Sequence, residues 1–352
     1  MKRNIFALLV LVLIVVLAVP VMAQDSLIES VCLVTDVGKV NDGTFNQFAY
    51  EGMQMAVEDF GLDSTYIETQ AQADYANNLN RCIEDGYNAI VTVGFLLADA
   101  TRAAAVENPD VYFIGVDQFV GADADGNAAP SNYVGLQFRE DQAGFLAGAL
   151  AAQLSQSGVV GGVYGIDIPP VIKYRNGFEN GAKFINPDIT TLGVYIDSFT
   201  APDRGAAAAG QFLGEGADVI FGAGGPTGSG AITRAAQDGA LVIGVDQDEF
   251  LTTFGNGETP GAENLISSAL KRVDVAVYTA IEMLVNGGEG FPGGDNIIMS
   301  AENDGVGFAE AHLAADKVPA EVTDYLEDIL VGLKRGWIST GVDPVTGELL
   351  EG

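Results

Sequence analysis

Short apolar runs alternate along the chain with longer segments in which apolar residues recur every three or four positions. The short runs predict buried strands and the longer spacing predicts helices, and their alternation is typical of a doubly wound parallel sheet. In the first half of the chain, strands are predicted at Val31–Thr35, Ser64–Glu68, Ala89–Val93, Val111–Gly115 and Tyr133–Leu136, and helices at Phe45–Phe60, Tyr75–Asp85 and Ala98–Glu107.

A second series of the same kind begins after a predicted helix at Gln142–Leu154. Its strands are predicted at Val159–Tyr164, Thr191–Tyr195, Asp218–Phe221 and Leu241–Gly244, and its helices at Val171–Ile185, Gly205–Leu213 and Gly230–Gln237. Single hydrophobic cores stop growing at about 250–300 residues. The 352 residues therefore predict an α/β protein of two lobes.

An internal repeat supports the two lobes. Asn88–Gln118 and Ala217–Gln247 each read as a strand, a glycine turn, a helix containing Thr-Arg-Ala-Ala and a strand ending in Ile-Gly-Val-Asp-Gln. Two motifs shared in the same order favour pseudo-symmetric lobes over a chance similarity of βαβ units. Ligands of doubly wound sheets bind outside the carboxyl ends of the strands, so a cleft between two such edges is the expected site.

The amino terminus has the features of an export signal. Two basic residues precede an apolar run from Ile5 to Val19, and small residues stand where a signal peptidase would cleave before Gln24. Residues 1–23 are therefore predicted to be a signal peptide, with an uncleaved membrane anchor as the alternative, although the run is short for a span. The mature protein is expected outside the cytoplasm, in the periplasm or at the cell surface.

Composition argues against several classes of function. The chain carries 48 acidic and 16 basic residues, and its formal charge of −32 repels nucleic acid and anionic lipid surfaces. Two cysteines and a single histidine, His312, nearly exclude a zinc or iron–sulfur centre and histidine-based catalysis, so we expect no cofactor and no metal. Cys32 and Cys82 either pair in an oxidising compartment or remain buried free thiols, and the sequence leaves both open.

The glycine-rich stretch Gly222–Gly230 follows a predicted strand and opens a predicted helix, as a phosphate-binding loop does. Its glycines do not fit the G-x-G-x-x-G register, and it contains no G-K-[ST]. A dinucleotide site is therefore not expected. The scarcity of Lys and Arg near the strand edges also disfavours phosphorylated ligands.

Polar and aromatic residues gather where the predicted strands end, in Asp36–Gln47, at Gly94 and Phe95, at Asp117, and in Phe221–Gly230 with Asp246. The first segment, Asp-Val-Gly-Lys-Val-Asn-Asp-Gly-Thr-Phe-Asn-Gln, resembles the D-x-G-x-x-D-x-S-F-N-Q opening of the basic membrane protein family, the substrate-binding proteins of ABC importers. Similar motifs follow in the family's order over nearly all of the mature chain, at Gly177–Asp188, Ala223–Gly230, Val242–Asp246 and Lys271–Ala276.

The resemblance implies a type I periplasmic-binding fold, with two doubly wound α/β lobes joined by three crossings. Lobe one is expected to comprise residues 29–137 plus 271–292, and lobe two residues 138–270 plus 293–352. The resemblance further implies a purine nucleoside, such as guanosine, inosine or adenosine, as the ligand. Its implied membrane partners are the permease subunits of an ABC transporter.

The resemblance also implies a binding site with three parts: an aromatic sandwich for the purine, polar groups for its edge, and charged groups for the ribose. In that order they are Phe45 and Phe221; Asp36 and Asn46; and Asp117, Asp246 and Lys271, with the backbone of Gly94, Gly224 and Gly225 nearby. Four departures from the family pattern leave the base preference open. They are Val37, Asn41, Gly43 and Pro226.

As residues alone, these positions have structural alternatives. The two phenylalanines could be core residues, the aspartates helix caps or turn residues, and Lys271 a surface charge. An aspartate at the end of both repeats favours a functional role for Asp117 and Asp246. The alternative function is a binding protein of the same fold for a sugar or another small polar solute. An extracellular nucleosidase is disfavoured by the scarcity of histidine and of metal-binding residues.

Overall fold

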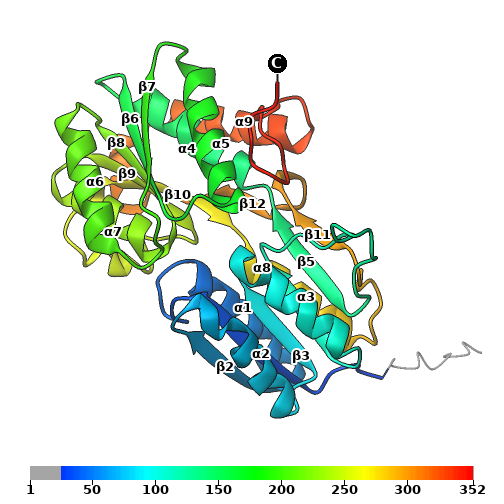
Figure 1. Cartoon of the computed structure of the whole chain (residues 1–352). Coiled ribbons are helices and arrows are strands. Elements are labelled where there is room, and N and C mark those ends of the chain that lie inside the picture. The colour runs from blue at the N-terminus through cyan, green and yellow to red at the C-terminus, as the bar shows by residue number, and fades with distance from the viewer. Residues whose placement is uncertain (1–24, 352) are drawn as a thin grey trace, which may run out of the picture.

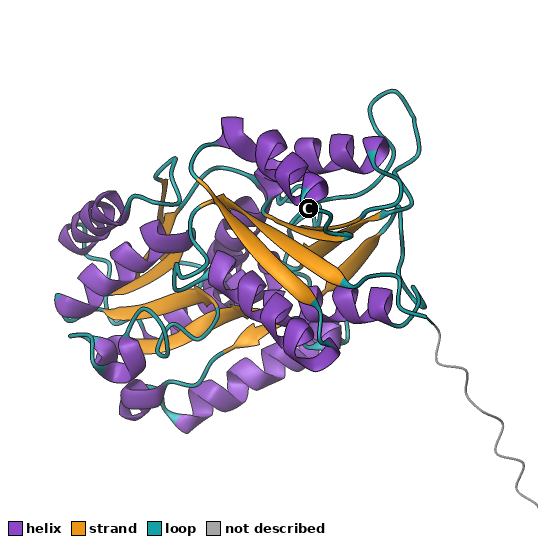
Figure 2. Ribbon diagram, turned by 90° about the horizontal axis from the view of Figure 1, so that it is seen from below, coloured by secondary structure: helices purple, strands orange, loops and turns teal. Residues whose placement is uncertain are grey.

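The computed structural model describes residues 25–351, which form two α/β lobes with a six-stranded sheet in each. Figure 1 shows the blue-to-cyan elements of the first lobe below the green-to-yellow elements of the second, and Figure 2 shows helices along both sides of the strands. The predicted fold class is confirmed. The predicted signal peptide lies outside the described residues. Within residues 25–351, no helix is both long and apolar enough to cross a membrane.

The first sheet has the strand order β11-β5-β4-β3-β1-β2, and all neighbouring strands in it are parallel. Its strands are β1 (Ser30–Val37), β2 (Asp63–Thr69), β3 (Ala89–Val93), β4 (Tyr112–Val116), β5 (Tyr133–Phe138) and β11 (Asn296–Met299), and its helices are α1 (Phe45–Phe60), α2 (Tyr75–Glu84), α3 (Ala98–Glu107) and α8 (Val273–Val285). Successive side chains of a strand face opposite sides of a sheet. Leu33 accordingly packs with α1 and α8, whereas Val34 packs with α2 and α3.

The second sheet has the order β12-β10-β9-β8-β6-β7 and is parallel except for β12, which pairs antiparallel with β10. Its strands are β6 (Val159–Tyr164), β7 (Thr190–Tyr195), β8 (Val219–Ala223), β9 (Leu241–Asp246), β10 (Leu265–Lys271) and β12 (Val306–Phe308), and its helices are α4 (Glu140–Leu154), α5 (Pro169–Ile185), α6 (Pro202–Gly214), α7 (Gly225–Gln237) and α9 (Ala320–Lys334). One face packs against α4, α5 and α9, and the other against α6 and α7.

The chain passes between the sheets three times, directly after β5, β10 and β11. The last crossing differs from the predicted boundary at residue 292, because the four-residue strand β11 still pairs with β5 in the first sheet. The strand follows a glycine-rich segment and has a mixed burial pattern, with Met299 buried and Ile298 exposed. So short a strand has no clear apolar run in the sequence, and the crossing therefore lies later in the chain than the pattern predicts.

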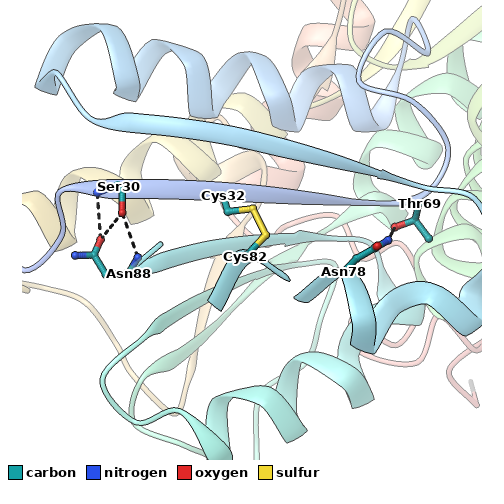
Figure 3. Close-up of a disulfide and its surroundings, with 6 residues drawn as sticks. All are labelled: Ser30, Cys32, Thr69, Asn78, Cys82 and Asn88. Atoms are coloured by element: carbon teal, nitrogen blue, oxygen red, sulfur yellow. Dashed lines mark hydrogen bonds between the residues drawn. A yellow bond between two sulfur atoms is a disulfide. The ribbon is translucent and has the colours of Figure 1, made fainter. Parts of the chain in front are cut away.

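A disulfide joins Cys32 of β1 to Cys82 of α2, which settles the alternative that the sequence left open (Figure 3). The two Cα atoms are 5.9 Å apart, within the usual range for such bonds. Nearby, Asn78 Nδ2 donates to Thr69 Oγ1 at 3.0 Å, and Asn88 Oδ1 accepts from the Ser30 amide at 3.1 Å. The disulfide therefore fastens α2 to β1, the strand next to the edge strand β2 of the first sheet.

Candidate functional site

A cavity lies between the lobes, at the carboxyl ends of the parallel strands. Both lobes contribute to its wall, and nine of the ten residues predicted from the sequence line it. These nine are Asp36, Phe45, Asn46, Gly94, Asp117, Gly224, Gly225, Asp246 and Lys271. The expected cleft between two strand edges is therefore present.

Phe221, the tenth residue, does not line the cavity, so its predicted place in an aromatic sandwich is corrected. Its side chain is fully buried on the α4–α5 side of the second sheet, where its ring stacks on Phe178 with centroids 5.2 Å apart. The alternation of side chains along β8 directs it into the core. The aromatic residues that the second lobe does supply to the cavity are Tyr174 and Phe199.

Phe199 and Tyr174 are aromatic site residues that sequence reasoning missed. Phe199 lies in the loop Asp197–Ala201, just after β7, and its backbone oxygen accepts a hydrogen bond from the Thr227 amide at 3.1 Å. The available signal was its position, because an aromatic residue in a polar loop at the carboxyl end of a parallel strand faces the ligand edge. Phe45 and Phe95 supply the aromatic surface of the first lobe.

Asp42 fixes the start of α1 and thereby places Phe45 and Asn46. Its carboxylate accepts from the backbone amides of Thr44 at 2.9 Å, Asn46 at 3.2 Å and Gln47 at 3.1 Å. These amides lie at the N-cap and in the first turn of α1, where they have no partner within the helix. Asp42 therefore stabilises the helix start from outside its first turn.

Asp36 has a different role from Asp42. It is the last buried residue of β1, and its Oδ1 accepts from Asn46 Nδ2 at 2.9 Å. Burial raises the pKa of Asp36 to about 7, against the lowering effect of the Asn46 hydrogen bond. Within the described residues, the buried Asn46 Oδ1 has no hydrogen-bond partner. The cavity therefore presents a carboxyl group and a free amide oxygen side by side.

Gly94 makes room for that pair. Its φ of +109° favours glycine, and a Cβ there would lie 3.1 Å from Asp36 Oδ2. Gly224, at the start of α7, has a φ of +147°, and a Cβ there would lie 2.4 Å from the backbone nitrogen of Gly165. Both turns therefore require the backbone to approach its neighbours closely beside the cavity.

Asp117 and Asp246 stand at equivalent ends of the repeated strand β4 and strand β9. Both have left-handed backbone conformations, with φ of +62° and +65°. Such a conformation is uncommon for a residue with a side chain and concentrates at functional sites. Burial, opposed mainly by Lys271, raises the pKa of Asp117 to about 6 and that of Asp246 to about 7. Tyr174 Oη donates to Asp246 Oδ1 at 3.1 Å.

Lys271 is the last residue of β10. Of the described residues that line the cavity, it is the one with a cationic side chain. Its Nζ lies 2.7 Å from Asp117 and 2.8 Å from Glu140, and 4.8 Å from the ring centroid of Phe45. Burial alone would lower the pKa of Lys271, but the neighbouring carboxylates raise it above its ordinary value. Its charge is therefore already shared between two carboxylates.

The two lobes also meet at the side of the cavity. Gln247 Nε2 of the second lobe donates to the backbone oxygen of Thr44 at 3.2 Å, and Thr252 Oγ1 donates to that of Gly43 at 2.7 Å. Both acceptors belong to the turn that leads into α1. These hydrogen bonds exist only while the lobes are in contact, so they favour the closed arrangement.

Comparison with known proteins agrees with this architecture. The Bmp family model, described as ABC transporter substrate-binding protein PnrA-like, matches residues 29–331. ABC transporter nucleoside-binding protein BmpA of Lactococcus lactis is 30% identical over 305 residues, 83% of each chain, and basic membrane protein A of Borreliella burgdorferi is 31% identical over 285 residues, 80% of this chain and 79% of the relative. A solved solute-binding protein of an ABC transporter system from Aeropyrum pernix has a TM-score of 0.75 and 26% identity, covering 88% of this chain and 92% of that chain.

Proposed function

This chain belongs to the Bmp family of PnrA-like ABC-transporter substrate-binding proteins, and we propose that it captures a purine nucleoside and delivers it to an importer. Members of this family bind a small molecule and present it to a membrane transporter, and they are not enzymes. The finer proposal concerns which small molecule is bound. It is supported by the chemistry of the cavity wall and by the name of the Lactococcus lactis relative, a nucleoside-binding protein.

The observation that carries the proposal is the combination of aromatic rings from both lobes with a set of buried acceptors. Phe45 of the first lobe and Phe199 of the second supply flat surfaces for a purine. Stacking of a base on an aromatic side chain contributes about 1–3 kcal/mol and accepts any base. The choice among bases therefore falls to hydrogen bonds, for which Asp36 and Asn46 Oδ1 are free to accept from N–H groups of the base.

The ribose part of the site is assigned to Asp117, Asp246 and Lys271. Carboxylates accept from hydroxyl groups, and a ligand without those hydroxyls would leave them buried and unpaired. The Lys271 ammonium is already balanced by Asp117 and Glu140. A phosphate would therefore enter a cavity rich in carboxylates without the arginine fork that such groups prefer. The proposed ligand is a neutral nucleoside and not a nucleotide.

The place of action proposed for the protein is outside the cytoplasm. The predicted signal peptide at residues 1–23 supports export, and the Cys32–Cys82 disulfide suits an oxidising compartment. The permease subunits of the importer are the proposed membrane partner. The acidic surface disfavours nucleic acid as a partner.

Mass spectrometry of the ligand released from the purified, denatured protein tests the proposal without assuming a base. The expected result is a purine nucleoside in near-stoichiometric amount. Release of a sugar, or of a nucleotide, in that amount would overturn the proposal.

Stacking and ribose contacts are separated by variants. Phe45→Ala and Phe199→Ala should each weaken all purine nucleosides by about 1–3 kcal/mol, because each removes one stacking surface. Phe119→Ala, at an exposed phenylalanine outside the cavity, is the matched control and should leave binding unchanged. Asp246→Asn should weaken inosine while leaving hypoxanthine little affected. Equal losses for inosine and hypoxanthine would contradict the ribose assignment.

A further inference from the structure

Four buried charged side chains form a continuous chain behind the ligand cavity. Asp117 contacts Lys271 Nζ at 2.7 Å, Lys271 Nζ contacts Glu140 at 2.8 Å, and Glu140 contacts Lys173 Nζ at 2.5 Å. The exposed fractions of these side chains are 6% for Asp117 and at most 2% for the other three. Asp117 and Lys271 line the cavity, whereas Glu140 and Lys173 do not. We call these four residues the ion chain.

The ion chain runs through two of the three crossings between the lobes. Glu140 is the first residue of α4, immediately after the crossing that follows β5, and Lys271 is the last residue of β10, immediately before the next crossing. Lys173, in α5, also donates to the backbone oxygen of Phe138 at 2.8 Å. Phe138 is the last residue of β5 in the first sheet. The ion chain thus connects the cavity wall with the segments about which the lobes would turn.

Stability alone is a weak reason for such an arrangement. Removing a charge from water is costly, and well-packed apolar residues in place of a buried ion pair are often equally stable or more so. The ion chain contains two carboxylates and two ammonium groups, so it balances internally. Burial would raise the pKa of Glu140, but Lys173 and Lys271 together lower it below its ordinary value. Glu140 is therefore charged and holds both lysines.

We propose that Glu140 and Lys173 are positioning residues for the ligand cavity, because Lys173 anchors Glu140 and Glu140 holds the Lys271 ammonium beside Asp117. The identity of the ligand rests on the proposed function, whereas the effect of Glu140 and Lys173 on Asp117 does not. Without Lys173, Lys271 is the only ammonium group paired with Glu140, and this stronger pairing weakens the contact between Lys271 and Asp117. Without Glu140, Lys271 turns fully to Asp117.

The two positioning residues act on Asp117 in opposite directions. Lys173 favours the ionised form of Asp117 and Glu140 disfavours it. The charged and titratable groups that face Asp117 are Lys271, Glu140, Lys173, Asp36, Asp246 and Tyr174. The variants of the two positioning residues below change only Glu140 and Lys173, which lie behind the cavity wall, and leave the groups that line the cavity unchanged. Their effects on Asp117 therefore separate charge from packing.

The test measures the titration of Asp117 in the ligand-free protein by carboxyl-carbon NMR, with Asp117→Asn identifying its signal. Lys173→Met should raise the pKa of Asp117 and Glu140→Gln should lower it, each by roughly half a unit or more. Lys183→Met, the same change at an exposed lysine of the same helix, should leave it unchanged. Shifts in the same direction, or none, in folded variants would overturn the proposal.

The double variant Lys173→Met/Glu140→Gln removes one charge of each sign and so avoids an uncompensated buried charge. Its Asp117 pKa should return toward the wild-type value, yet Lys271 loses its anchor. Inosine affinity should therefore fall by roughly tenfold in the double variant, and Lys173→Arg should retain most of it. Wild-type affinity in the double variant would overturn the positioning role. Failure of the wild-type protein to bind inosine would contradict the proposed function and leave the Asp117 titration as the deciding result.

Discussion

Strand β4 of the first lobe and strand β9 of the second lead into the same five residues, Ile-Gly-Val-Asp-Gln. The last two of these residues, an aspartate and a glutamine, make different contacts in the two lobes. The aspartates Asp117 and Asp246 adopt the same left-handed conformation, are similarly buried and line the same cavity. Only Asp117 has a direct ion pair with Lys271, whereas Asp246 accepts from Tyr174. A repeated residue can therefore keep its place at the ligand edge while its electrostatic surroundings diverge.

The glutamines diverge further. Gln118 Nε2 donates to the backbone oxygen of Gly94 at 3.0 Å, and Gln118 Oε1 accepts from Tyr133, so its contacts stay within the first lobe. Gln247 instead donates across the cleft to Thr44. One copy of the motif therefore supports the glycine turn beside the cavity, while the other contributes to closure.

The largest effects are expected when the two aspartates are neutralised. Asp117→Asn removes one partner of a buried ion pair and should lower the free energy of unfolding by about 3–5 kcal/mol. Asp246→Asn removes a buried carboxyl group without a direct ion pair, so the stability at pH 8 should be unchanged or higher. Both variants should weaken nucleoside binding. Chemical denaturation measures the stability of the two variants, and titration calorimetry measures their nucleoside affinity. Similar losses of stability in the two variants would contradict the different surroundings assigned to Asp117 and Asp246.

The disulfide distinguishes the first lobe from the second. Cys32 and Cys82 are 50 residues apart, and removing a native disulfide typically costs about 2–5 kcal/mol, because the unfolded chain gains freedom. In Cys32→Ala/Cys82→Ala, amide hydrogen exchange should therefore increase in β1–β4 and α2 well before it does in β6–β9. Uniform loosening of both lobes would show that they unfold as one unit.

The pH dependence should separate the two aspartates again. A bound hydroxyl or N–H donor favours an ionised carboxylate, so binding should release protons and affinity should rise with pH, by at most about tenfold per unit for each group. Asp117, with a pKa of about 6, should account for the lower part of this rise, and Asp36 and Asp246, with pKa values of about 7, for the upper part. In calorimetric titrations between pH 5 and 8, Asp246→Asn should reduce the rise of nucleoside affinity in the upper part of this range.

Stability of the ligand-free protein should change with pH in the opposite sense. The folded pKa values of these carboxyl groups lie above their unfolded values, so the folded state binds more protons in the interval between them. The stabilisation is complete below about pH 4 for these groups and is lost as the pH rises through about 7. A melting temperature that does not fall between pH 5 and 7.5 would contradict the burial of these carboxyl groups.

The smallest effects concern closure. Gln247→Leu and Thr252→Val each remove one cross-cleft hydrogen bond and should weaken binding by about 0.5–1.5 kcal/mol, mainly through faster ligand release. Thr253→Val is the control, because Thr253 bonds only within the second lobe, to Glu249. Gln118→Leu should instead reduce stability. Stopped-flow measurements of release, which should be unchanged in the control, check this prediction.

Much of the fold followed from sequence pattern, because buried parallel strands and amphipathic helices have distinct apolar spacings. Some elements lack such spacing: β11 is four residues long, and the first turn of α7 lies in the glycine-rich stretch at Gly225 and Pro226. The strands β10 and β12 and the helix α9 were not predicted either. The apolar pattern also could not predict which side of the sheet Phe221 faces, because every residue of β8 is buried and no polar face marks its two sides. Phe199 was overlooked because loop residues carry no periodicity.

A neutral purine nucleoside is the proposed ligand of the interlobe cavity. Titration calorimetry of the ligand-free protein with inosine and with inosine 5′-monophosphate tests this proposal. We expect one saturable inosine site per chain and monophosphate binding at least about tenfold weaker, a difference of about 1.4 kcal/mol. Equal affinities for the two compounds, or no binding of inosine, guanosine or adenosine, would contradict it.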